Sequence, residues 1–216
     1  MNLYGRERRL LSKCLVGDRY LLKRAEQGKL SQFYDIGANV GIVSILCRLM
    51  HPECKIYAFE PFKQTYDRLV ENVDNLKVKC NQLAYGNGED FYCFKDRKTS
   101  LCNSFLKDTD CTLTWGKDRF GEKVKSFTLN EMLFTGCNST CVKMDCEGAE
   151  HYLINDTRST EKLKCVRWIS IEVHEVNEKM SIKNFMHYIY KSFEETHEID
   201  FYDNNGKAIQ LRMVKK

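Results

Sequence analysis

The sequence lacks most of the features that mark membrane, secreted or fibrous proteins. It has only two prolines in 216 residues, which excludes proline-rich linkers and collagen-like or mucin-like stretches. The longest apolar run, 42–47, is short and is interrupted by Ser44, whereas a membrane span needs roughly 20 apolar residues. No apolar run follows the basic residues at the start, so no secretory signal peptide is expected. These absences predict a cytoplasmic protein without a membrane span, in which the sequons at Asn138 and Asn155 are accidental.

Paired metal-binding cysteines are also missing, although cysteine itself is abundant. The eleven cysteines are scattered and form no Cys-x-x-Cys pair. The tightest grouping, Cys137, Cys141 and Cys146, does not have the spacing of a zinc site. Without export, we expect reduced thiols that serve as small apolar residues.

What is present suits a single folded domain with a basic start. The chain has 43% hydrophobic and 30% charged residues and a net charge of +4. Much of the positive surplus lies in residues 1–30, which hold eight basic residues, Arg19 and Lys23 among them, against three acidic ones. We interpret this stretch as a basic helical segment with a solvated face, with contact to phosphates or an acidic glycan as the alternative.

From residue 31 onward, strand and helix patterns alternate. Strands are predicted at 32–36, 55–59, 78–85, 141–144 and 166–173. Helices are predicted from the apolar stripe that runs from Ile42 to Leu49 and Met50, from a stripe that includes Leu69 and Val70, and after Ser181. The C-terminal residues 201–213 are predicted to form a β-hairpin. This order favours an α/β fold with a mostly parallel sheet, helices on both faces and an antiparallel hairpin at one edge.

The first strand ends in a glycine-rich turn, Asp35-Ile36-Gly37-Ala38-Asn39-Val40-Gly41. A dinucleotide-binding turn has glycine where this chain has Asn39, and the Gly-x-x-x-x-Gly-Lys-Ser/Thr pattern is absent. We expect the Asp35 carboxylate to point into the turn, where it would repel a pyrophosphate by several kcal/mol at ~4 Å. The turn therefore favours a cationic ligand without phosphate, and S-adenosylmethionine fits that description.

The next two strands add further candidates for binding this cofactor. Glu60 ends the second strand and is placed to accept hydrogen bonds from both ribose hydroxyls. Pro61 and Phe62 follow it, and the aromatic ring is expected to lie against adenine. Asn81 in the third predicted strand completes the predicted cofactor-binding set.

A second cluster, KMDCEGAE (143–150), lies further along the chain, with FTLNE (127–131) before it and IEVH (171–174) after it. Together with FYDIGANVG (33–41) and AFEP (58–61), these segments resemble the FkbM family of S-adenosylmethionine-dependent methyltransferases. One departure is Asn130, where the family commonly has Asp, and both residues cap helices well. The resemblance implies a Rossmann-like class I methyltransferase domain over 31–216 with a seven-stranded sheet. In that domain, 86–125 would be an insertion that shapes the substrate pocket.

The second cluster lies where the fourth and fifth predicted strands end, and two interpretations of its chemistry stay open. In the first, Asp145, Glu172 and His174 hold a divalent cation, Mg²⁺ or Mn²⁺, that lowers the pKa of an acceptor hydroxyl. In the second, Asp145 or His174 is a general base and Glu147 orients the acceptor. Lys143 is expected to pair with Glu147 or Glu150.

The resemblance implies methyl transfer to a hydroxyl, often of a sugar or a small metabolite. The leading hypothesis is an O-methyltransferase acting on a carbohydrate, either free or within a glycan. An RNA ribose 2′-O-methyltransferase would need a Lys-Asp-Lys-Glu arrangement that recruits Lys23 and Lys164, so nucleic acid is not the expected partner. A small-metabolite methyltransferase and a scaffold that has lost catalysis are further alternatives, and the oligomeric state stays open.

Overall fold

The computed structural model describes residues 12, 14, 17–26, 30–96, 103–106, 119–132, 137–204 and 208–216. A seven-stranded sheet forms its centre, in the order β3-β2-β1-β9-β10-β12-β11. Its strands are β1 (Gln32–Ile36), β2 (Lys55–Phe59), β3 (Val78–Asn81), β9 (Thr140–Met144), β10 (Trp168–His174), β11 (His197–Asn204) and β12 (Ala208–Lys215). β12 pairs antiparallel with both of its neighbours, and the other pairings in this sheet are parallel. The predicted class I methyltransferase sheet with its antiparallel hairpin is confirmed.

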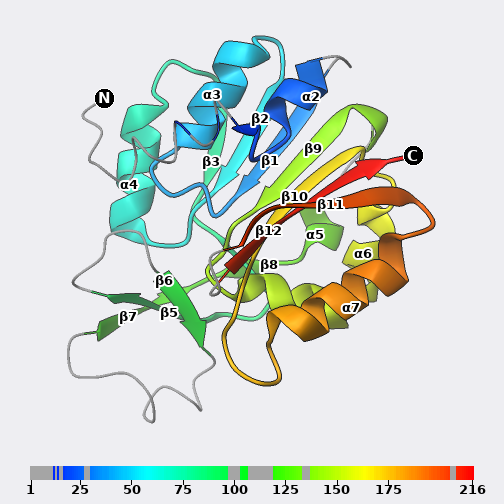
Figure 1. The fold of residues 1–216 in the computed structure, drawn as a ribbon. Coiled ribbons are helices and arrows are strands. Elements are labelled where there is room, and N and C mark those ends of the chain that lie inside the picture. Colours follow the sequence, from blue (N-terminus) through cyan, green and yellow to red (C-terminus); the bar gives the residue numbers. More distant parts are fainter. Residues whose placement is uncertain are drawn as a thin grey trace.

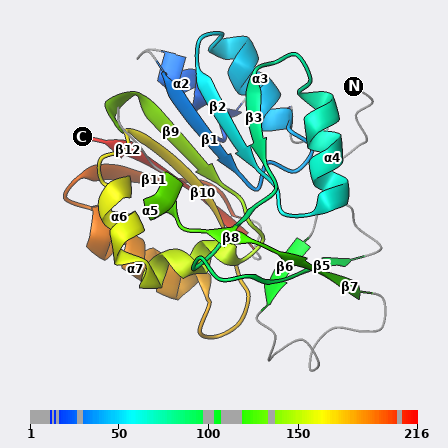
Figure 2. The same cartoon turned by 180° about the vertical axis from the view of Figure 1, so that it is seen from behind.

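Helices cover both faces of this sheet, as Figures 1 and 2 show. The helices are α2 (Leu22–Glu26), α3 (Ile42–Met50), α4 (Lys63–Asn72), α5 (Leu129–Met132), α6 (Thr157–Leu163) and α7 (Ile182–Phe193), with 3-10 turns η1 (Cys137–Ser139) and η2 (Ala149–Asn155). The alternation of side chains along a strand explains the two layers. On β1, Phe33 packs in a core with residues of α2 and α3, whereas Tyr34 packs in a second core with residues of α6 and α7. Trp168 of β10 is buried in the first core.

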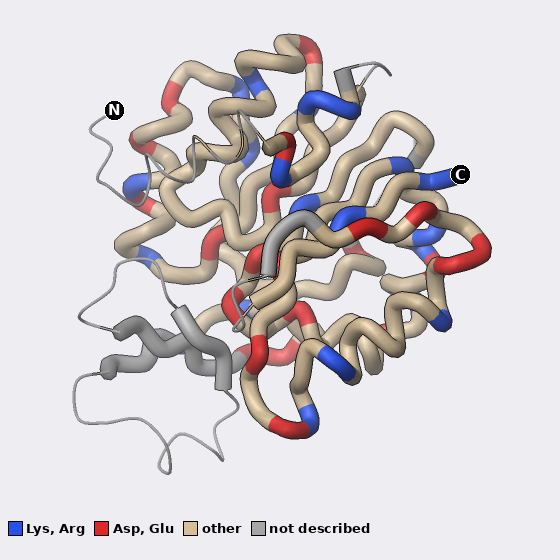
Figure 3. The backbone as a smooth tube through the Cα atoms, viewed as in Figure 1, with Lys and Arg blue, Asp and Glu red and all other residues tan. Residues whose placement is uncertain are grey.

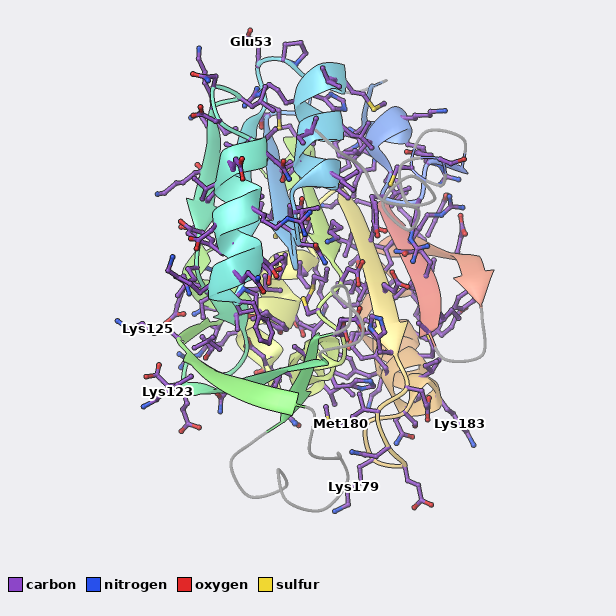
Figure 4. The ribbon with its side chains drawn as sticks, turned by 90° about the vertical axis from the view of Figure 1, so that its left-hand side faces the viewer. Glu53, Lys123, Lys125, Lys179, Met180 and Lys183 are labelled. Carbon is purple, nitrogen blue, oxygen red and sulfur yellow. The ribbon has the colours of Figure 1, made fainter. Side chains whose placement is uncertain are left out.

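Strand order reverses between β1 and β9, which places a binding site at their carboxyl ends. β1 continues in sequence to β2 on one side, while β9 and β10 lie on the other side. Figure 4 shows exposed Lys179 and Lys183, which follow β10, at the end of the molecule toward which the central strands run, whereas Glu53, just before β2, lies at the opposite end.

Three expectations about the elements are wrong. The predicted strand at 78–85 is divided, because β3 belongs to the large sheet whereas β4 (Ala84–Tyr85) pairs with β8 (Ser126–Phe127). On α3, Leu49 is 70% exposed, and on α4, Val70 is 43% exposed. Both side chains therefore lie outside the buried stripes of their helices.

The predicted insertion at 86–125 contains a small sheet of its own. Its described parts form β5 (Phe91–Asp96), β6 (Asn103–Leu106) and β7 (Arg119–Val124), with β5 antiparallel to both neighbours. Figures 1 and 2 show this sheet beyond the end of α4, set apart from the seven-stranded sheet. Its role in shaping a substrate pocket stays a prediction. Across the described residues, no helix is both long enough and apolar enough to span a membrane.

Candidate active site

The turn after β1 has a backbone shape that requires glycine at two positions. Gly37 has a φ of +74°, and a Cβ there would lie 1.9 Å from the Asp145 backbone oxygen. Gly41, which begins α3, has a φ of +88°, and a Cβ there would lie 2.7 Å from Leu69 Cδ1. The left-handed backbone favours glycine at both positions, and at Gly37 the contact with backbone also excludes a larger residue. The turn after β1 and the loop after β9 therefore touch each other at the point where the strand order reverses.

Asp35 does not face the turn as expected. It is fully buried, its Oδ2 accepts a hydrogen bond from Ser44 Oγ at 2.7 Å, and its Oδ1 lies 3.0 Å from Lys143 Nζ. Lys143 Nζ also donates to the Gly37 carbonyl at 2.6 Å. Lys143 thus pairs with Asp35, not with a carboxylate of its own loop. The predicted repulsion of a pyrophosphate by a free Asp35 is wrong, because Lys143 neutralises that charge.

Glu60 lies directly after β2, as predicted, but its carboxylate already accepts hydrogen bonds from two nearby backbone amides. Its Oε2 accepts from Asn39 N at 3.0 Å and its Oε1 from Phe62 N at 3.2 Å. Carboxylate oxygens have further lone pairs, so a role in ribose binding stays a prediction. Phe62 is 1% exposed and packs with Ala84 and Val124, so its ring is a core side chain and does not offer a free face to adenine.

The remaining predicted cofactor residues stand at the same edge of the sheet. The Asn81 side-chain amide donates to the Ala58 carbonyl, and the Asn81 carbonyl accepts from Glu60 N at 3.1 Å. Pro61 is half-buried, and its carbonyl accepts from Gln82 Nε2. Asn39 has a left-handed backbone, with a φ of +51°, and its buried Oδ1 has no hydrogen-bond partner among the described residues. This amide oxygen is free to accept from a ligand.

The loop after β9 is held by Glu150, which the sequence suggested only as a partner of Lys143. Glu150 is fully buried and accepts from Cys146 N at 2.6 Å and from Gly148 N at 2.9 Å. Between these two amides, Glu147 adopts a left-handed backbone with a φ of +52°. Non-glycine residues in this region store strain, typically of order 1–3 kcal/mol, and cluster at functional sites. The Glu147 side chain is 30% exposed, more than the side chains of Glu150 (0%) and Glu172 (15%).

His174 lies between two of these carboxylates at the end of β10. Its Nδ1 is 3.3 Å from Glu150 Oε1, and its Nε2 is 3.4 Å from Glu147 Oε2. Burial by itself would lower the pKa of His174, but Glu150, followed by Glu147 and Asp145, outweighs it and raises the pKa to about 11. His174 is therefore an imidazolium at neutral pH, with both nitrogens carrying protons. The prediction that His174 is a general base does not agree with these contacts.

Burial and neighbouring charges also shift the carboxylates themselves. Burial raises the pKa of Glu147 to about 8, with Asp145 and Glu150 adding to the rise and His174 opposing it. Burial also raises the pKa of Glu172 to about 7. The negative charge of Asp145 adds to this rise, and the positive charge of Arg19 opposes it. For Asp145, burial is outweighed by Lys143, His174 and Arg19, so its pKa is lowered.

Two residues from the N-terminal segment complete the site, and the sequence analysis missed both. Arg19 is 6% exposed and forms an ion pair with Glu172, and its Nε donates to Gln210 Oε1 at 2.8 Å. Tyr20 is 1% exposed, and its hydroxyl donates to Asp145 Oδ2 at 3.1 Å. The expectation of a solvated basic face is wrong at Arg19. The one local signal, a basic residue and an aromatic just before an apolar run, is too common to indicate a site.

The donor set does not fit the predicted metal site. Single ligand atoms of Asp145, Glu147 and His174 lie within 4.8 Å of one another, with Glu147 where Glu172 was expected. Glu172 is instead held by Arg19. A histidine ligates a metal through a deprotonated nitrogen, and both His174 nitrogens face carboxylates as proton donors. With its protons directed at Glu147 and Glu150, His174 is not arranged as a metal ligand.

The cluster as a whole suits a cationic ligand. Its five carboxylates, Asp35, Asp145, Glu147, Glu150 and Glu172, face three cations, Arg19, Lys143 and His174. Figure 3 shows acidic positions gathered around the middle of the molecule, where the central strands end. Opposite charge favours binding of a positive group in a partly buried site. Asp145, whose pKa is lowered, keeps its negative charge at these strand ends. Together with the Asn39 oxygen and the glycine turn, this charge fits the sulfonium and ammonium groups of S-adenosylmethionine.

Comparison with known proteins agrees with this geometry. A family model described as the methyltransferase FkbM domain matches residues 35–205, most of the chain. The chain belongs to the FkbM methyltransferase family. This membership implies S-adenosylmethionine as the methyl donor. The match begins at Asp35, so Arg19 and Tyr20 lie outside the FkbM domain as that model defines it.

Individual relatives are distant. Hexuronic acid methyltransferase AglP from Haloferax volcanii is 26% identical over 160 residues, which make up 72% of this chain and 60% of AglP. Among solved structures, the methyltransferase FkbM from Methylobacillus flagellatus has a TM-score of 0.53 at 11% identity, covering 86% of this chain and 44% of that one. An rRNA methylase from Streptococcus thermophilus has a TM-score of 0.52 at 8% identity, and the match covers 93% of this chain and 96% of that one. The matched part of this FkbM chain thus spans 60% of AglP, and the structural matches support its fold alone.

Proposed function

We propose that this FkbM protein transfers a methyl group from S-adenosylmethionine to a hydroxyl of a sugar, free or within a glycan. The observation that carries the proposal is the placement of Glu147 beside the His174 imidazolium, at the carboxyl ends of β9 and β10. A relative that is named as a hexuronic acid methyltransferase supports a carbohydrate acceptor.

The side chains would share the work of making a neutral hydroxyl nucleophilic. Glu147, as a carboxylate with a pKa of about 8, is well matched to accept the hydroxyl proton near neutral pH. His174 orients that carboxylate through its Nε2, while Glu150 holds the imidazolium from the other side. The cofactor supplies an electrophilic methyl group when bound. This assignment gives Glu147, not Asp145 or His174, the role of base.

A transfer assay with labelled S-adenosylmethionine tests the proposal. We expect incorporation of label into a panel of neutral hexoses, deoxyhexoses or hexuronate-containing oligosaccharides, and stability of the product to mild alkali, as an ether requires. Incorporation only into RNA, only into small aromatic hydroxyls, or only as an alkali-labile ester would contradict a sugar hydroxyl as acceptor. The salt dependence gives a second reading, because RNA binding weakens steeply as ionic strength rises.

The RNA alternative finds no support in the arrangement of its lysines. Lys164, just after α6, pairs with Glu161 at 2.7 Å, and Lys23 is exposed on α2. α2 and α6 contribute to the cores on opposite faces of the sheet. Neither lysine replaces Lys143, which is the buried lysine beside Asp145 and is already paired with Asp35.

A further inference from the structure

A short turn before α2 is fixed to the sheet by buried polar contacts. We call residues 18–21 the N-terminal turn. Asp18 and Leu21 both have left-handed backbone, with φ of +49° and +62°, and the Asp18 carboxylate caps α2 by accepting from Lys23 N at 2.7 Å and from Arg24 N at 3.0 Å. Both tight bends place Arg19 and Tyr20 side by side against the sheet.

The backbone of the N-terminal turn is held by two central strands. The Arg19 carbonyl accepts from Ser170 Oγ of β10 at 3.0 Å, and the Tyr20 carbonyl accepts from Cys141 Sγ of β9 at 3.7 Å. Gln210 of β12 joins the same network, because its Nε2 donates to Ser170 Oγ at 2.8 Å. All these groups are buried, and buried polar groups of this kind specify one arrangement only when each is satisfied.

The side chains of the turn reach the two strand-end carboxylates. Arg19 bridges Glu172 and Gln210, while the Tyr20 hydroxyl bonds Asp145. The Tyr20 ring lies 5.6 Å from both Arg19 Cζ and Lys143 Nζ, so it is held between two cations. Asp145 follows β9, and its backbone oxygen is the atom that a Cβ at Gly37 would strike. The carboxylates that the turn holds therefore stand at the strand ends where a ligand of this fold binds.

We propose that Arg19 and Tyr20 are positioning residues, which hold the carboxylates of Glu172 and Asp145 in fixed orientations where the cationic methyl donor binds. The proposal rests on the proposed function in taking S-adenosylmethionine as the donor, and it is independent of the acceptor. Tyr20 itself is too buried to touch substrate. Its effect on the donor passes through Asp145.

Two ligands that differ in charge at sulfur separate this role from simple packing. S-adenosylmethionine carries a sulfonium, whereas S-adenosylhomocysteine has a neutral thioether. A fixed carboxylate stabilises the first more than the second, while a loosened fold weakens both alike. The affinity ratio of the two ligands is therefore the diagnostic quantity.

Calorimetry on Tyr20→Phe provides the main test. The variant keeps the ring between the two cations and removes one hydrogen bond to a charged group. We expect the Kd for S-adenosylmethionine to rise about tenfold and the Kd for S-adenosylhomocysteine to change less than about twofold. The matched control is Tyr188→Phe, which removes a hydroxyl bonded to Thr160 Oγ1 at 2.5 Å on the α7 side of the sheet and should change neither Kd.

A second pair of variants covers the case in which Tyr20→Phe is too unstable to assay. Arg19→Lys keeps the positive charge but loses the planar fork that reaches Glu172 and Gln210 together, so S-adenosylmethionine should again be weakened relative to S-adenosylhomocysteine. Arg24→Lys changes an exposed arginine, 3.6 Å from Asp200, in the neighbouring helix and should have no effect. Equal weakening of both ligands in Tyr20→Phe and Arg19→Lys, or no weakening in either, overturns the positioning role. Normal donor binding without transfer to any sugar contradicts the proposed function alone.

Discussion

At the scale of single residues, the site is built from charges that are already paired. Lys143 holds Asp35, Arg19 holds Glu172 and Tyr20 holds Asp145, so the orientations of these carboxylates are fixed by the protein. Glu147 is different, because its contact with His174 is 3.4 Å long and its side chain is 30% exposed. A partly exposed carboxylate that is held by one long contact is well placed to exchange a proton with substrate.

Replacing Glu147 with Gln should therefore lower the rate of methyl transfer. We expect kcat to fall about 100- to 1000-fold, the usual effect of removing a general base, with the Kd for S-adenosylmethionine within about threefold. In the native protein, kcat/KM should rise with pH through about 8, because Glu147 must lose its proton to act. Steady-state kinetics from pH 6 to 9 on both proteins would check this.

The control for that experiment is Glu161→Gln, which changes a carboxylate on α6 that pairs with Lys164 at the surface. It should leave kcat and the pH profile unaltered. If Glu147→Gln keeps the native rise with pH, another group is the base.

The donor set leads to a second prediction at this scale. Because His174 serves as a proton donor to two carboxylates, transfer should not require a divalent cation. Protein treated with excess EDTA and then desalted should retain its activity, and added Mg²⁺ or Mn²⁺ should change it less than about twofold. Loss of activity on chelation, restored by one of these ions, would instead support the metal site predicted from Asp145, Glu172 and His174.

At the scale of elements, local sequence patterns predict the bounds of helices and strands well, but they predict poorly which side chains contact each other. The bounds of β1, β2 and α3 agree with the strand and helix patterns, since hydrophobic period and glycine turns are local signals. The predicted partner of Lys143 is wrong, because its actual partner, Asp35, is far away in sequence. Only the pairing of β1 with β9 brings Asp35 and Lys143 together. Arg19 was missed for the same reason, as its contacts to β10 and β12 lie more than 150 residues away.

The glycine turn after β1 allows a test of how closely two elements approach. Gly37→Ala should destabilise the protein by more than about 2 kcal/mol, since a left-handed non-glycine residue costs roughly 1–2 kcal/mol and its Cβ would also strike the Asp145 backbone. Gly88→Ala is the matched control, because Gly88 has a similar φ of +89° and its nearest neighbour, Thr128 Cγ2, is 3.9 Å away. The difference between the two variants in the free energy of unfolding, measured by urea denaturation, gives the cost of the contact without the cost of the left-handed backbone. Equal destabilisation would show that the loop after β9 yields to the added methyl.

At the scale of the whole molecule, the two cores are apolar, and the buried ionic cluster lies at one end of the sheet between them. The cluster draws residues from the N-terminal turn, β1, β9, β10, the loop after β9 and η2. The buried ion pairs of this cluster therefore link elements that are distant in sequence. Protonation changes in this cluster act on the stability of the entire fold, because unfolding separates all of these elements at once.

The direction of that effect follows from the shifted pKa values. The pKa of His174 is raised from 6.5 to about 11, and those of Glu147 and Glu172 are raised from 4.5 to about 8 and about 7. In all three cases the folded state holds protons that the unfolded state releases. The stability due to His174 is complete below about pH 6.5 and is lost as the pH rises toward 11, and the two glutamates act in the same direction from about 4.5 upward.

We therefore expect the free energy of unfolding, measured by urea denaturation, to decrease from pH 7 to pH 9. In that range His174 contributes at most one proton, or about 1.4 kcal/mol per pH unit. His174→Gln should flatten the decrease by up to that amount, whereas His187→Gln, which changes an exposed histidine on α7, should leave it unchanged. A native stability that is level over this range, or a His174→Gln curve parallel to the native one, would mean that His174 is not held as an imidazolium between Glu147 and Glu150. The assignment of Glu147 as the base would then lose its oriented partner, since that assignment depends on a proton that stays on His174 while Glu147 gives up its own.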